Sequence, residues 1–135
     1  MRKLIILLPF HVATMSLLFL LLLVILFHVG VMLGLIPTTI VWGGRFNDPK
    51  QIMGMEFVSI GVNLFLMGLI AAKANYIKHK IPLKIIQILL YLFVTLFLLN
   101  TVGNLLAKDS LEKAIFTPIT LVSAIVIARI AMEKE

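Results

Sequence analysis

Four long apolar runs, each close to the thickness of a bilayer, occupy nearly all of this 135-residue chain. They extend over Val12–Ile36, Ile52–Ala72, Ile85–Leu106 and Ile115–Ile130. A helix needs about 20 predominantly apolar residues to cross roughly 30 Å of hydrocarbon, and the mean hydropathy of +1.14 is far outside the range of soluble domains. The runs therefore predict an all-α integral membrane protein, a four-helix transmembrane bundle.

Local capping signals predict where the spans begin. Asp48 followed by Pro49 fits an N-cap with proline at the first helical position, and Asp109 with Glu112 fits a capping box. Pro82 suits the first turn of the third helix. We expect a single transmembrane domain over residues 1–135, with spans at about 10–36, 49–78, 82–107 and 110–132.

The positively charged residues are divided unequally between the two sides of the membrane that these spans imply. Because Lys and Arg accumulate in cytoplasmic segments, the larger group predicts a multi-pass protein of the cell (plasma) membrane with both termini cytoplasmic. The larger group has eight members, Arg2, Lys3, Lys73, Lys78, Lys80, Lys84, Arg129 and Lys134, and the smaller has four, Arg45, Lys50, Lys108 and Lys113.

The composition also narrows the classes of partner and cofactor. The net charge of +6 comes from basic residues at the membrane edges without interleaved aromatic residues, so membrane lipids are expected partners and nucleic acids are not. The absence of cysteine excludes thiol chemistry, disulfides and Cys-ligated metals. No P-loop, HExxH motif or paired histidine at metal spacing occurs, so we expect no cofactor and no metal.

The most polar residues of the spans fall at one depth. At about 1.5 Å per residue, Glu56 lies roughly 10 Å from the outer end of the second helix and His28 roughly 13 Å from the outer end of the first. Asn100 and Asn104 of the third helix come to the same layer. An acid within a span is costly and usually faces an interior or a cavity. We therefore predict an outward-facing polar pocket around Glu56.

Three further residues extend the predicted ligand-binding set. Asn63 lies seven residues after Glu56, about 20° round the same helix face. Arg45 and Trp42 belong to the first outer connection, whose apolar residues predict a lid or a short re-entrant segment that packs over the outer mouth of the bundle. A purely structural interpretation stays open, in which the asparagines bond between helices and a neighbouring side chain satisfies His28.

Two patterns predict helix packing. Gly54, Gly61 and Gly68 repeat every seven residues on the side of the second helix away from Glu56, and small residues permit close contact with a neighbouring helix. Pro118 interrupts the backbone hydrogen bonding of the fourth helix. We expect the hydroxyl of Thr117 to satisfy the carbonyl that this proline frees.

No motif names a reaction, so three functional hypotheses remain. The first is binding of a lipid or small hydrophobic ligand in the pocket, with no catalysis. The second is proton-coupled transport of a small molecule by a homodimer acting through Glu56. The third is an intramembrane enzyme that uses Glu56 and His28 as a proton-transfer pair. The apolar inner half of the spans disfavours transport relative to binding.

The transport hypothesis has an architectural parallel. With four spans and an acid within a span, this short chain resembles the small multidrug resistance exporters, in which an intramembrane Glu exchanges protons for cationic drugs within a dimer. Their Glu lies in the first span, whereas Glu56 lies in the second. The resemblance is one of architecture and not of kinship, and it carries over no residue roles.

Overall fold

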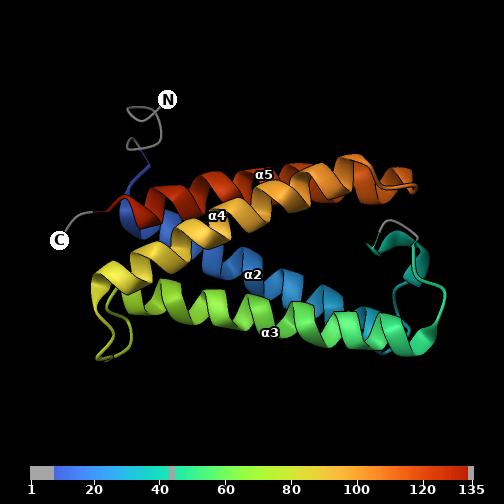
Figure 1. Cartoon of the computed structure of the whole chain (residues 1–135), viewed down its shortest axis with the longest axis horizontal. Helices are drawn as coiled ribbons and strands as arrows, with labels where there is room; N and C mark the ends of the chain where they lie inside the picture. The colour runs from blue at the N-terminus through green and yellow to red at the C-terminus, as the bar shows by residue number, and fades with distance from the viewer. Residues whose placement is uncertain (1–7, 43–44, 134–135) are drawn as a thin grey trace.

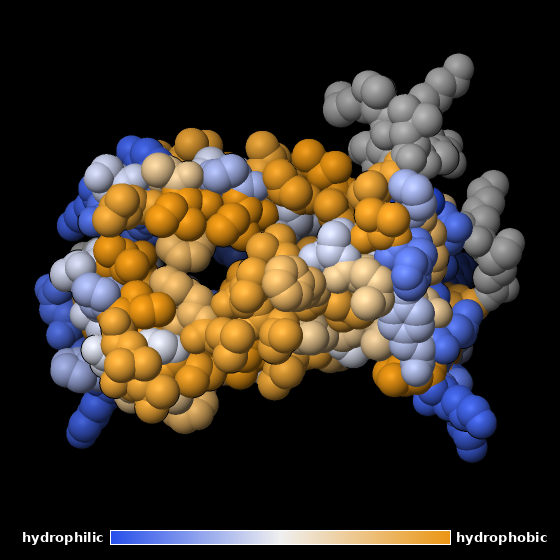
Figure 2. All heavy atoms as spheres, turned by 180° about the vertical axis from the view of Figure 1, so that it is seen from behind, coloured by the Kyte–Doolittle hydropathy of each residue, from blue (hydrophilic) through white to orange (hydrophobic). Residues whose placement is uncertain are grey.

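The computed structural model describes residues 8–42 and 45–133, and within these residues the chain is entirely helical apart from its connections. The elements are α2 (Phe10–Met32), the 3-10 helix η1 (Thr38–Ile40), α3 (Pro49–Lys73), α4 (Leu83–Leu105) and α5 (Ser110–Ala131). In this part of the chain, four helices are long and apolar enough to cross a membrane. Figure 2 shows the corresponding apolar surface between two more hydrophilic ends. The expected four-helix transmembrane bundle is confirmed.

The predicted N-caps form. The Asp48 carboxylate accepts a hydrogen bond from the backbone N–H of Lys50 at 3.0 Å, and Pro49 opens α3. The Asp109 carboxylate accepts from the backbone N–H of Glu112 at 2.9 Å at the start of α5. These side chains satisfy backbone donors that a helix start leaves unpaired.

Two helices end earlier than the sequence predicted. α2 ends at Met32 rather than near residue 36, because Gly34 adopts a φ of +72° and turns the chain back. α3 ends at Lys73 rather than near residue 78, because Asn75 adopts a φ of +57°. Both turns carry the paired backbone hydrogen bonds of a left-handed helix stop, with the residue after each turn donating to the carbonyl of Gly30 or Ala71. An apolar run in the sequence can thus extend beyond the end of the helix that it forms.

The four helices form two hairpins that meet at one end of the bundle and diverge at the other (Figure 1). α2 pairs with α3, and α4 packs along α5. We call the two ends of the bundle the η1 end, which carries residues 33–42 and 45–48, and the α3–α4 end, which carries residues 74–82. Arg129 Nε donates to the carbonyl of Leu8 at 2.8 Å, so the first and last described residues lie together at the α3–α4 end.

The apolar core has two separate parts. The larger part joins all four helices in the half nearer the α3–α4 end, and its fully buried side chains include Leu17, Leu66, Leu90 and Ile127. The smaller part lies at the η1 end, where Val31, Val41 and Ile52 are buried beneath the η1 loop. Burying side chains of this size stabilises by about 1.5–3 kcal/mol each. The larger part therefore joins the two hairpins in this half of the bundle, whereas the smaller part joins only α2, α3 and the loop between them.

The glycine face of α3 does not make the close helix contact that its spacing predicted. Gly54, Gly61 and Gly68 are exposed, and a Cβ added at any of them would meet no atom within 4 Å. The prediction was wrong because α3 turns its Glu56 face, and not its glycine face, toward α2. By contrast, a Cβ at Gly30 of α2 would lie 2.8 Å from the Cδ1 of Ile36, so the end of that side chain would have to shift to make room for it.

Candidate functional site

The centre of the candidate site is the carboxyl group of Glu56, which is 0% exposed two turns into α3. His28 Nδ1 lies 2.6 Å from its Oε2 atom, and the indole Nε1–H of Trp42 donates to its Oε1 atom at 2.7 Å. The His28 side chain is 15% exposed. Both carboxyl oxygens thus have partners from outside α3, which offsets the cost of burying an acid within a membrane span.

The η1 loop places Trp42 over this carboxyl group. The backbone N–H of Val41 donates to the carbonyl of Thr38, and the buried Val41 side chain anchors the loop on Val31 and Ile52 at the ends of α2 and α3. Trp42 and Phe46 pack against this group, with their ring centroids 6.5 Å apart. The loop therefore closes over the ends of α2 and α3, as the apolar sequence of the connection predicted.

Trp42 has a strained backbone conformation. Its φ of +58° lies in the left-handed region, which residues with large side chains rarely adopt. Such a conformation costs roughly 1–3 kcal/mol and persists only when surrounding contacts enforce it. Here the enforcing contacts are the bond to Glu56 and the packing on Phe46. The loop is a closed cover under backbone strain.

The other predicted members of the site lie elsewhere. The Asn63 amide is buried but donates to the carbonyl of Ser59 in its own helix at 2.8 Å. Arg45 is exposed, and its side chain makes no hydrogen bond or ion pair with any residue that the structure describes. Asn100 is likewise exposed and unpaired with respect to residues 8–42 and 45–133. Of the predicted set, the structure thus brings His28 and Trp42 into hydrogen-bond contact with Glu56, whereas Asn63 bonds within its own helix and neither Arg45 nor Asn100 bonds to that carboxyl group.

Asn104 belongs to a second polar cluster, between α4 and α5. Its amide donates to Thr120 Oγ1 at 3.4 Å, and Thr101 Oγ1 lies 2.9 Å from the same atom. Thr117 Oγ1 is buried without a hydrogen-bond partner, so the expectation that it satisfies a carbonyl freed by Pro118 is also wrong. The two clusters follow the two hairpins: Thr101 and Asn104 of α4 bond to Thr120 of α5, whereas Glu56 of α3 bonds to His28 of α2 and Trp42 of the η1 loop.

Sequence reasoning missed several buried polar residues, among them Thr101 and Glu112. Thr101 bonds across to α5, and its position three residues before Asn104 on one helix face was an available signal. Glu112 is only 5% exposed, although its place in the first turn of α5 suggested a capping role alone. One turn further along α5, Phe116 contacts Phe27 with ring centroids 4.9 Å apart. The η1 end therefore contains two buried acids, Glu56 and Glu112.

A hollow opens in the apolar surface between the hairpins. Figure 2 shows it in the half of the molecule nearer the η1 end, with strongly hydrophilic atoms visible inside. Its position agrees with the separation of the core into two parts. An opening in the lipid-facing surface that leads from apolar walls to polar groups has the form of a site for an amphipathic molecule.

The site has the donors for proton exchange but not for a metal ion. His28 Nδ1 and Glu56 Oε2 lie 2.6 Å apart, which is within the distance that direct proton transfer requires. Within residues 8–42 and 45–133, no third His, Asp or Glu completes a group that could hold a metal ion.

Comparison with known proteins found no relative from which a role could be transferred. No protein-family model matches the chain, and neither a curated protein nor a solved structure matches it.

Proposed function

We propose that this chain is a multi-pass protein of the plasma membrane that binds a lipid or small hydrophobic ligand through the hollow between its two hairpins. The apolar part of the ligand occupies the hollow, and its polar group lies toward Glu56 and His28. The observation that carries the proposal is the opening in the lipid-facing surface with hydrophilic atoms inside it (Figure 2). Apolar pockets with a few convergent polar groups are the usual form of a small-molecule site.

Unused hydrogen-bonding capacity near the η1 end supports a ligand with a polar group. The Thr117 hydroxyl is buried without a partner, and the exposed Asn100 amide lies within a membrane-spanning helix. Lipid tails cannot satisfy such groups, and each unsatisfied polar group costs free energy. Asn100 also comes seven residues after Phe93, which contacts Phe65 of α3 with ring centroids 5.9 Å apart. Asn100 therefore lies on the side of α4 that turns toward α3.

The closed η1 loop supplies a binding mechanism. A ligand hydroxyl or amide donates to Oε1 of Glu56 in place of the indole N–H of Trp42. Release of Trp42 relieves its left-handed backbone conformation, and this relief offsets part of the cost of opening the loop. The proposal therefore couples ligand binding to movement of Trp42.

The proposed orientation places the α3–α4 end in the cytoplasm and the η1 end outside. Lys78, Lys80 and Lys84 lie at the α3–α4 end and are exposed. This accumulation of exposed positive charge supports a cytoplasmic location under the positive-inside rule. Arg2, Lys3 and Lys134, which the sequence argument also counted, lie outside the described residues.

Trp42 is the only tryptophan of the chain, so its fluorescence tests the proposal directly. The purified protein in detergent micelles is titrated with 9,10-dibromostearic acid, a fatty acid whose bromine atoms quench indole emission at close range. We expect saturable quenching, together with a red shift as Trp42 leaves its packed position.

The control moves the tryptophan to a lipid-facing site. The variant Trp42→Phe/Phe19→Trp places the indole on α2 at a position that is 62% exposed. Its emission should fall without saturation, as the fatty acid merely partitions into the micelle. Identical quenching curves for the two proteins would contradict a binding site near Trp42.

The pair of His28 and Glu56 favours one second candidate, proton-coupled transport by a homodimer. At a separation of 2.6 Å, the Glu56 carboxyl group and the His28 imidazole can pass a proton between them inside the membrane-spanning bundle. Proteoliposomes loaded with a pH-sensitive dye and given the lipophilic cation tetraphenylphosphonium test this candidate. Cation-dependent proton flux that is lost in Glu56→Gln would favour transport over binding alone.

A further inference from the structure

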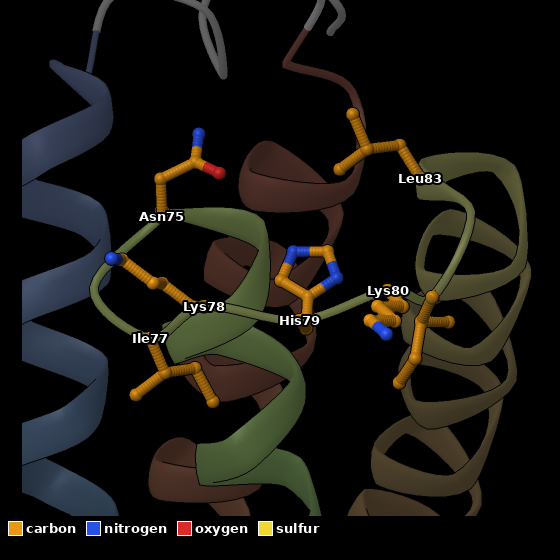
Figure 3. Close-up of a pocket in the computed structure, with 7 residues that line it drawn as sticks. Asn75, Ile77, Lys78, His79, Lys80 and Leu83 are labelled. Atoms are coloured by element: carbon orange, nitrogen blue, oxygen red, sulfur yellow. The ribbon is translucent and has the colours of Figure 1, made fainter.

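Another hollow lies at the α3–α4 end, the opposite end of the bundle from Trp42. It has a volume of about 680 Å³, enough for a group larger than a single phosphate, and it is lined by residues of the α3–α4 connection and the first turn of α4. Figure 3 shows the imidazole of His79 standing in the middle of this hollow, with Lys78 and Lys80 on either side. The hollow therefore combines three nitrogen-bearing side chains that are consecutive in the sequence.

His79 is held in a defined orientation with one ring nitrogen unused. Its Nε2 atom lies 3.1 Å from the carbonyl oxygen of Ala72, which only accepts hydrogen bonds, so Nε2 carries the proton. Nδ1 is buried and has no hydrogen-bond partner. When the ring is protonated, Nδ1–H is a donor that lacks an acceptor. A buried donor of this kind costs free energy until an acceptor, such as an anionic oxygen, reaches it.

The surroundings of the hollow are positively charged. Lys78, Lys80 and the neighbouring Lys84 are exposed, so their ammonium groups can turn toward a ligand. Among the described residues at this end, the acidic side chain is that of Glu133, which Arg129 already binds at 2.6 Å. The hollow therefore attracts an anion. Because Glu133 is already paired with Arg129, the lysines around the hollow stay available for a ligand.

The remaining walls are apolar. Ile77 and Ile81 are exposed, and Leu83 begins α4 at the edge of the membrane-spanning segment. A soluble anion has no apolar surface to bury against such walls, whereas the glycerol backbone and the first acyl-chain carbons of a lipid do have such surface. Lysines immediately beside transmembrane helices are typical of sites for acidic lipids.

We infer that this hollow is a specific site for the headgroup of an anionic phospholipid. Lys78 and Lys80 neutralise the phosphate, Nδ1 of His79 donates to one of its oxygens, and Ile77, Ile81 and Leu83 contact the apolar part of the lipid. The site is independent of the ligand proposed for the η1 end. An experiment that disproves the anionic-lipid site would therefore not contradict that proposal.

Native mass spectrometry of the detergent-solubilised chain tests the site with equimolar phosphatidylglycerol and phosphatidylcholine. The wild type should retain phosphatidylglycerol preferentially. The variant Lys78→Gln/Lys80→Gln should bind it roughly thirtyfold more weakly, at about fivefold for each lysine removed. The matched control is Lys108→Gln/Lys113→Gln, which removes the same charge from exposed positions at the η1 end and should change binding less than twofold.

His79→Gln separates a built site from general attraction to positive charge. The glutamine amide can still donate to the carbonyl of Ala72, but no donor remains at the position of Nδ1. We expect phosphatidylglycerol binding to fall about tenfold, as for a lost hydrogen bond to a charged group. Equal losses of phosphatidylglycerol binding in Lys78→Gln/Lys80→Gln and in Lys108→Gln/Lys113→Gln would overturn the inference. Unchanged binding in both of these variants would overturn it as well. Displacement of the lipid by millimolar inorganic phosphate would also overturn it, because the ligand would then be free phosphate.

Discussion

His28 and Glu56 are 28 positions apart in the sequence, yet His28 Nδ1 and Glu56 Oε2 lie 2.6 Å apart where α2 and α3 pack together. The pair is completed from above by Trp42, so two helices and a loop share one buried carboxyl group. Removing any one of the three side chains leaves a partner unsatisfied.

Glu56→Gln should preserve the fold and most of its stability, whereas Glu56→Leu should destabilise the fold. Glutamine has nearly the same shape and still accepts from Trp42 and bonds to His28, while leucine leaves both without a partner. We expect the leucine variant to lose about 2–4 kcal/mol in the free energy of unfolding and the glutamine variant less than about 1 kcal/mol. Thermal unfolding in detergent, followed by circular dichroism, measures the difference. Similar melting temperatures for both variants would mean that the polar bonds contribute little.

Trp42→Phe should lower the free energy of unfolding by about 1–3 kcal/mol, because a buried carboxyl oxygen loses its donor while most of the ring packing is kept. The background Glu56→Leu supplies the control in a double-mutant cycle. If the indole hydrogen bond is the cause, Trp42→Phe should be nearly neutral in that background. An equal loss in both backgrounds would assign the effect to packing on Phe46 instead.

Alanine should have opposite effects at two glycines. Gly34 has a φ of +72°, so Gly34→Ala should destabilise by about 1–2 kcal/mol. Gly54 is helical, exposed and free of neighbours within 4 Å of an added Cβ, so Gly54→Ala should stabilise by about 0.5–1 kcal/mol. The pair of melting temperatures measures both effects. Destabilisation by Gly54→Ala would indicate a close contact on that face, such as a second copy of the chain.

Cysteine labelling should define the orientation, because the natural chain has no cysteine to interfere. With an external η1 end, Asn47→Cys should react with a membrane-impermeant maleimide in intact cells. Lys78→Cys should react only after permeabilisation. The opposite pattern would invert the proposed topology, and it would place the anionic-lipid site in the outer leaflet.

The sequence by itself determined the features that depend on local chemistry. Bilayer thickness requires about 20 apolar residues per span, so the four runs predicted four helices correctly. Asp48 and Asp109 predicted two helix starts, because an N-cap acts within its own first turn. The apolar character of the η1 connection predicted that Trp42 would pack against the bundle, and the cost of an acid in a membrane predicted that Glu56 would be buried.

Only the tertiary structure decided which polar groups meet. Depth along a helix placed Glu56, His28, Asn100 and Asn104 in one layer, but depth does not specify rotation about the helix axis or distance between helices. The core around Leu66 and Ile127 binds the hairpins at the α3–α4 end and lets them diverge toward η1. Asn104 consequently bonds to Thr120, while Glu56 bonds to His28 and Trp42. These pairings depend on packing between segments distant in sequence, which residue spacing within one helix cannot encode.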